Sequence, residues 1–125
     1  MKTYFGLALA MFAGVAIGAT AINRLNAQGT PGAYAVADIS EISDPQAFKK
    51  VIDEAPAVIA ASGGRFIIRT ENITALDGTP PKRFAVIAFD NVEKARSWYN
   101  SPASKALLDI QKRATKTRFF IVQGM

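Results

Sequence analysis

Two arginines on one short strand are the first candidates for chemistry. The stretch SGGRFIIRT, residues 62–70, has the pattern of a helix end followed directly by a strand. Alternation along that strand puts Arg65 and Arg69 on one face, with Ile67 between them. Such cations can guard an exposed strand edge, or pair with Glu71 or with an acid of a partner chain. Alternatively, they line a pocket and donate charge-assisted hydrogen bonds to a carboxylate or an enolate.

Three further side chains are candidates for the same pocket. Trp98 and Tyr99 can form its aromatic wall, although their helical spacing also fits a place in the core. Asp38, near the end of an early strand, is the carboxylate whose place local rules do not explain. Asp77 precedes a glycine in a turn pattern and Asp90 stands where a helix cap is expected, so structure accounts for both. Arg65, Arg69, Trp98, Tyr99 and Asp38 are therefore the candidate ligand-binding residues.

Composition removes several reaction types. The 125 residues include no Cys and no His. Thiol nucleophiles, disulfides, a Ser-His-Asp triad and the usual zinc sites each need one of those side chains. No cluster of oxygen ligands suggests a metal either, and we expect no metal and no cofactor. No pair of carboxylates has a spacing that demands catalysis.

The net charge of +5 does not predict nucleic-acid binding. Setting aside Lys2 and Arg24, which lie in or beside an N-terminal apolar segment, leaves 13 basic against 10 acidic residues. These charges alternate in sign along KKVIDEA and SKALLDIQKRATK, as on solvated helix faces, and form no basic stripe. We expect no nucleic-acid partner.

The N-terminus has the pattern of a secretory signal. Lys2 precedes an uncharged apolar run that ends in small residues. Cleavage sites follow Ala21 or Ala27, and the later one leaves a chain beginning at Gln28. The run is also near the lower limit for spanning a bilayer, so an uncleaved anchor is the alternative. Residues 1–27 are thus a signal peptide or anchor and the only membrane contact expected, residues 28–32 are a short linker, and the domain at 33–125 is periplasmic or secreted.

The remaining pattern is strand, helix, strand, repeated once. Asp44 and Pro45 are typical of a helix start, Gly63 of a helix end, and Pro56 is expected to kink or break the helix between them. A second helix begins near Asp90 or Asn91 and restarts at Ser101-Pro102. Strands are expected at 33–39, 64–70, 83–90 and 117–124. The order βαββαβ predicts an α+β, ferredoxin-like domain, with a four-stranded antiparallel sheet and its helices on one face.

The last two strands are apolar on both faces, which a sheet covered on one side does not need. Phe84, Val86 and Ala88 alternate with other apolar residues, and Phe120 with Val122 opposes a second apolar pair. An apolar patch of this size favours a second copy packed face to face, so we infer a homodimer.

Several separated motifs, in this order, resemble the DUF1330 family of domains of unknown function. They are Asp44-Pro45 before a helix, GGRFIIR, LDG, a strand ending AFD, ARSWYNSP, a helix with a late Arg113, and a closing IVQG. The resemblance implies a dimeric α+β barrel, whose relatives often bind a small molecule between sheet and helices. Some relatives are cofactor-free monooxygenases, isomerases or heme-handling enzymes, but the family has no established reaction. After Ser101-Pro102 the family usually has an acidic or polar residue and then Tyr, where this chain has Ala103-Ser104.

Three functional classes follow from these patterns. The first is an exported dimeric domain that binds a small anionic or aromatic molecule without a cofactor. The second is a cofactor-independent enzyme, of monooxygenase or isomerase type, acting on a small organic acid. The third is a structural interaction module.

Export with cleavage can be checked by intact mass. Protein recovered from the cell envelope should lack its first 21 or 27 residues, because the small residues there fit the cleavage site of a signal peptidase. Recovery of the full-length chain in the membrane fraction would show the anchor instead.

Overall fold

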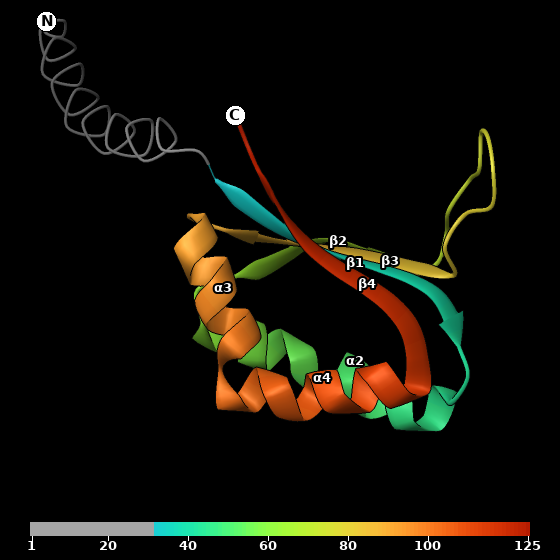
Figure 1. The fold of residues 1–125 in the computed structure, drawn as a ribbon, viewed down its shortest axis with the longest axis horizontal. Helices are drawn as coiled ribbons and strands as arrows, with labels where there is room; N and C mark the ends of the chain where they lie inside the picture. The colour runs from blue at the N-terminus through green and yellow to red at the C-terminus, as the bar shows by residue number, and fades with distance from the viewer. Residues whose placement is uncertain (1–31) are drawn as a thin grey trace, which may run out of the picture. The chain divides into compact units, whose positions relative to one another are not determined.

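A computed structural model describes residues 32–125 of the chain (Figure 1). The expected signal peptide or anchor, and the linker up to residue 31, lie outside the described residues. Between residues 32 and 125, no helix has the length and apolar character needed to cross a membrane.

Four strands and three helices make up the domain. Their bounds are β1 Ala33–Ile42, α2 Pro45–Ala61, β2 Arg65–Thr70, β3 Arg83–Phe89, α3 Val92–Asn100, α4 Pro102–Ala114 and β4 Thr115–Gln123. The sheet is antiparallel with strand order β2-β3-β1-β4, and the helices lie on one side of it (Figure 1). The predicted ferredoxin-like α+β fold is confirmed.

Helix α2 begins and ends as its sequence predicts. The Asp44 carboxylate accepts a hydrogen bond from the Ala47 amide at 3.0 Å, and Pro45 occupies the first turn. Gly63 ends the helix with φ +85°, a left-handed conformation that glycine adopts without a steric penalty. Pro56, however, does not break the helix, which is continuous from Pro45 to Ala61.

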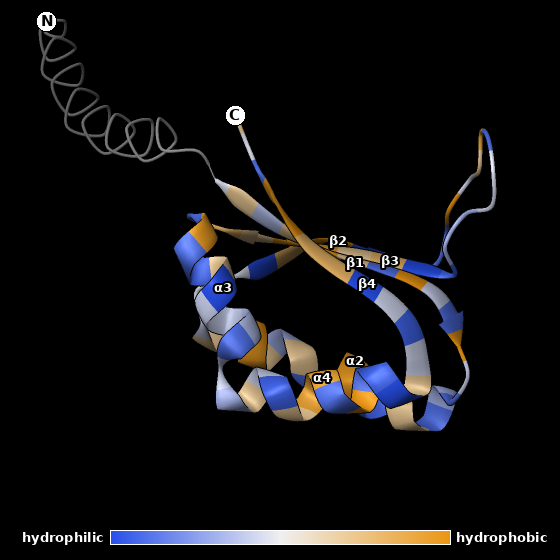
Figure 2. Cartoon of the chain, in the orientation of Figure 1, coloured by the Kyte–Doolittle hydropathy of each residue, from blue (hydrophilic) through white to orange (hydrophobic). Residues whose placement is uncertain are grey.

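Helices α3 and α4 are separated by a single residue. Ser101 closes α3, and its hydroxyl then accepts a hydrogen bond from the Ser104 amide at 3.2 Å as the N-cap of α4. The cap of α3 is Asn91, whose side chain accepts from the Lys94 amide at 2.9 Å. Asp90 was the other candidate for this cap, and it instead forms an exposed ion pair with Lys94 at 3.5 Å. Hydrophobic and hydrophilic segments alternate along the ribbon of α4, as expected for an amphipathic helix with one apolar and one polar face (Figure 2).

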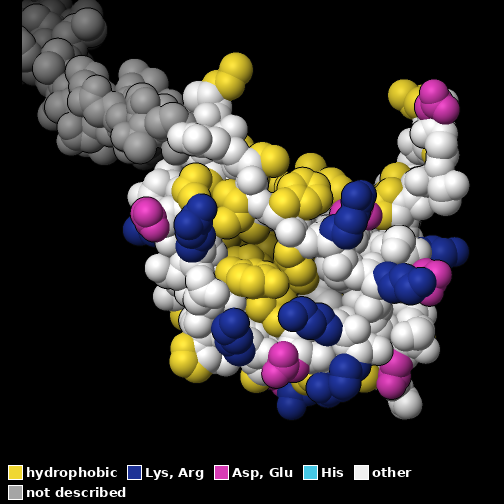
Figure 3. Space-filling view, viewed as in Figure 1, with side chains coloured by type: hydrophobic (Ala, Val, Ile, Leu, Met, Phe, Trp, Pro, Cys, Tyr) yellow, Lys and Arg dark blue, Asp and Glu magenta, His cyan; other side chains and the backbone are white. Residues whose placement is uncertain are grey.

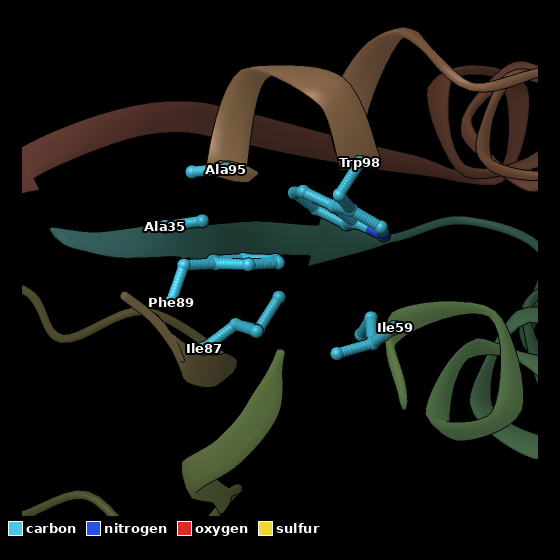
Figure 4. Close-up of a cluster of buried hydrophobic side chains, with 6 residues drawn as sticks. All are labelled: Ala35, Ile59, Ile87, Phe89, Ala95 and Trp98. Carbon is cyan, nitrogen blue, oxygen red and sulfur yellow. The ribbon is translucent and has the colours of Figure 1, made fainter. Parts of the chain in front are cut away.

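Strand pairing separates the two faces of the sheet. Ala35, Ile87 and Phe89 face the helices and form a buried cluster with Ile59, Ala95 and Trp98 (Figure 4). The opposite face, which we call the open face, is covered by none of the helices in residues 32–125. Its apolar side chains alternate with the helix-facing ones; they are Tyr34, Val36, Ile68, Phe84, Val86, Ala88, Phe120 and Val122. The strands are therefore apolar on both faces, as predicted.

A bulge in β2 changes which face its arginines occupy. Phe66 pairs with Ile87, but the register shifts between Phe66 and Ile68. As a result Arg65 lies opposite Ala88, on the open face, whereas Arg69 lies opposite Ala85, on the helix side. Simple alternation, which put both arginines on one face, is wrong here because the bulge inserts one unpaired residue.

The contact between Gly64 and Phe89 gives a test of this packing. A Cβ added at Gly64 would lie 2.5 Å from Phe89 Cε1, inside the buried cluster. We expect Gly64→Ala to lower the free energy of unfolding by about 1–3 kcal/mol, because the ring must move within a close-packed core. In Gly32→Ala, the control, the nearest atom is 3.7 Å from the added Cβ, so stability should hardly change. Equal denaturation midpoints for the two variants would contradict the packing of Phe89.

Candidate functional site

A cavity lies on the helix side of the sheet, between the strands and helices α2 and α4. Its volume, as the space open to the centre of a water molecule, is about 60 Å³. A single water needs about 10–15 Å³ on this measure, so the cavity has room for several waters or a few heavy atoms of a ligand. Its lining is mostly apolar; the polar side chains in it are Arg69, Arg83, Ser104 and Gln111, with Trp98 as an indole wall.

Arg69 is one of two cations that line the cavity, and much of its side chain is exposed to solvent. Its guanidinium donates from Nη2 to the Ile52 carbonyl and lies 4.7 Å from the centroid of the Phe66 ring. Within residues 32–125, no carboxylate oxygen lies within 4.0 Å of its guanidinium nitrogens. The Arg69 charge is thus held by a carbonyl dipole and an aromatic face, without an ionic partner from the described chain.

Arg83 places a second cation beside it. Its side chain is 14% exposed, and Nη1 lies 3.1 Å from Glu71 Oε2. Glu71 was one expected partner for Arg65 or Arg69, but in the structure its carboxylate forms an ion pair with Arg83. Sequence reasoning did not single out Arg83, because it stands at the start of a strand otherwise interpreted by its apolar residues.

Burial lowers the pKa of Arg69 below its ordinary value, and the charge of Arg83 lowers it further. Asp53 acts in the opposite direction. Both main causes disfavour the charged form, one by removing water and the other by repulsion between like charges. An anion close to both guanidinium groups would offset these effects, because an opposite charge favours the charged form.

Trp98 belongs to the core and to the cavity wall at once. It is 6% exposed, its ring centroid is 5.6 Å from that of Phe89, and it also lines the cavity (Figure 4). The two interpretations of this residue, core and wall, therefore both describe its position.

Tyr99 lies outside the cavity. Its ring packs edge-on against Phe119 at 5.7 Å and lines a separate groove between α3 and β4, which also includes Arg96 and Phe120. Trp98 and Phe119 line both the groove and the cavity. Figure 3 shows hydrophobic side chains gathered in a hollow on this side of the domain.

Arg65 and Asp38 are on the open face, away from the cavity. Arg65 is exposed there at the sheet edge. Asp38 pairs across the strands with Arg118, Oδ2 to Nη2 at 2.5 Å, and its side chain is only 17% exposed. This cross-strand ion pair explains the one carboxylate that the sequence left unassigned.

Ser104 and Gln111 enter the cavity from α4 and were missed by sequence reasoning. Ser104 is 1% exposed, and its hydroxyl oxygen has no hydrogen-bond partner among residues 32–125. Gln111 is 6% exposed and donates from Nε2 to Thr117 Oγ1 at 3.3 Å. The signal for Ser104 was its departure from the family pattern, at a position where a Tyr is usual.

No group of three or more Asp and Glu side chains in residues 32–125 is placed to hold a metal ion. Among the residues that the structure describes, those lining the cavity include no carboxylate.

The family follows from a comparison of the sequence. Residues 32–125 match the model of a family described as a domain of unknown function, DUF1330. The chain belongs to the DUF1330 family. No protein of curated function matches the sequence.

Solved structures share the fold of this DUF1330 domain at low sequence identity. A protein of unknown function from Rhodopseudomonas palustris is 8% identical, with a TM-score of 0.64 over 81% of this chain and 90% of that one. SnoaB, a cofactor-independent oxygenase from Streptomyces nogalater, is 11% identical, with a TM-score of 0.56 over 77% and 94%. An ethyl tert-butyl ether D family protein from Bacillus halodurans is 13% identical, with a TM-score of 0.53 over 75% and 99%. These similarities establish the fold alone.

Proposed function

We propose that this DUF1330 domain binds a small organic acid in its helix-side cavity. The observation that carries the proposal is Arg69, a partly desolvated cation beside Arg83 that has no carboxylate partner within the described residues. Two guanidinium groups next to an apolar cavity form a site for one carboxylate, which can accept charge-assisted hydrogen bonds from both.

The rest of the lining suits the apolar part of such a ligand. Trp98, Phe66 and Phe119 are among the side chains around the cavity. A cavity of about 60 Å³ is well below the roughly 150 Å³ of an engineered cavity that binds benzene, so the preferred acid is short, or places its carboxylate outside the enclosed space.

Binding is favoured over catalysis by what lines the cavity. The lining residues of the described chain include no Asp, Glu, Lys or Tyr. A proton-transfer reaction needs a base within hydrogen-bond reach, and arginine stays protonated. The fold shared with SnoaB keeps a cofactor-independent reaction as the alternative, in which Arg69 and Arg83 would stabilise an enolate.

The proposal includes export and a homodimer. Export rests on the N-terminal sequence pattern. The dimer rests on the open face, where Ile68, Phe120 and Val122 are 43–44% exposed, around better-shielded central positions. A second copy placed face to face would cover these side chains and close the two sheets into a barrel.

Ligand binding can be tested by calorimetry with butanoate and propanoate at low salt. Arg69→Gln should weaken binding of the better acid by about tenfold or more, since a hydrogen bond to a charged group contributes about 1.5–3 kcal/mol. Arg65→Gln is the matched control, because that arginine lies on the same strand but on the open face. Its affinity should equal that of the wild type.

Equal affinities in wild type, Arg69→Gln and Arg65→Gln would remove Arg69 from the site. Turnover of a bound acid, detected by mass spectrometry, would show that the domain is an enzyme.

Dimerisation can be tested by light scattering on residues 28–125. The wild type should have twice the chain mass, and Val122→Glu should give a folded monomer, because a charge at the interface would be buried unpaired. The half-exposed position in the single chain tolerates that charge. Ser97→Glu, at an exposed site on α3, should stay dimeric. A wild type that is a folded monomer at micromolar concentration would contradict the proposed dimer and its barrel.

A further inference from the structure

The Ser104 hydroxyl is a buried polar group without a partner. Its residue is 1% exposed, and Oγ forms no hydrogen bond with the described chain. A hydroxyl can donate one hydrogen bond and accept two, and leaving it unpaired in an apolar environment is unfavourable. Ser104 also lines the cavity, so a molecule inside the cavity can supply the missing partner.

Gln111 adds a second polar group on the same helix. It stands seven residues after Ser104, which is two turns of α4, and it lines the same cavity. Its Nε2 donates to Thr117 Oγ1 at 3.3 Å, and Thr117 Oγ1 lies 2.6 Å from Thr115 Oγ1. These contacts hold the Gln111 amide, while Ser104 remains free.

The polar groups reach the cavity from two layers of the domain, the sheet and the helices. Arg69 and Arg83 come from the edge strand β2 and its neighbour β3. Ser104 comes from the first turn of α4, in the helix layer. The lining between them is apolar.

We infer that the occupant is a bifunctional small acid. Its carboxylate binds Arg69 and Arg83, and a hydroxyl or carbonyl oxygen at its other end forms a hydrogen bond with Ser104 Oγ. The inference rests on the proposed function and narrows its ligand class to hydroxy and oxo acids. Selectivity follows because an acid without the second group leaves Ser104 unpaired.

The test compares acids that differ by one hydroxyl. Butanoate is paired with 4-hydroxybutanoate, and propanoate with 3-hydroxypropanoate, each titrated by calorimetry into wild type, Ser104→Ala and Ser97→Ala. In the wild type and in the exposed control Ser97→Ala, at least one hydroxy acid should bind about tenfold tighter than its parent, the size of one hydrogen bond to an otherwise unpaired group. In Ser104→Ala that ratio should fall to about one, with the affinity of the parent acid unchanged.

Ser104→Ala should also melt at or above the wild-type temperature without ligand, because it removes an unpaired hydroxyl and improves helix propensity. Should the alanine variant not fold, Ser104→Cys keeps the volume similar and weakens the donor, so the ratio should fall there as well.

Two results overturn the inference in distinguishable ways. A hydroxyl preference that is absent from the wild type, or that persists in Ser104→Ala, overturns the assignment of Ser104 alone, and an ordered water is then its partner. Absence of binding by all four acids, or binding that Arg69→Gln does not weaken, overturns the proposed function together with it.

Discussion

The structure depends on how a four-stranded sheet with apolar side chains on both faces is shielded from water. Helices α2, α3 and α4 cover one face, and their buried side chains form the core around Trp98 and Phe89. The open face has no such cover within the described chain, although Val36 and Val86 at its centre are shielded by their neighbours. This asymmetry gives the two faces different roles: one encloses a cavity, and the other is available to a second copy.

Much of the fold could be predicted from local patterns. Asp44, Gly63 and Ser101-Pro102 mark helix ends through backbone and capping chemistry that does not depend on distant residues. Two-residue alternation in β3 and β4 sorted their side chains into two apolar sets, and the strand pairing in the structure shows which set faces the helices. Pro56 shows the limit of such rules, because packing of α2 preserves a continuous helix across it.

The candidate site was less predictable because it depends on a bulge and on contacts between distant elements. The register shift after Phe66 puts Arg69 on the helix side and leaves Arg65 on the other face, which no count of alternating residues shows. The position of Asp38 is explained by its ion pair with Arg118, which lies eighty residues later in the sequence. Ser104 belongs to no sequence motif, and it becomes a candidate site residue only because the fold buries it beside the cavity.

The central claim is that an acid enters on the helix side of the sheet. Methyl NMR spectra recorded during titration with the acid test this directly, because methyl groups report on each face separately. We predict that the methyl signals of Ile52, Val58 and Leu107, which line the cavity, shift as the acid is added. Those of Val86 and Val122, on the open face, should remain in place. Shifts confined to the open-face methyl groups would contradict the account.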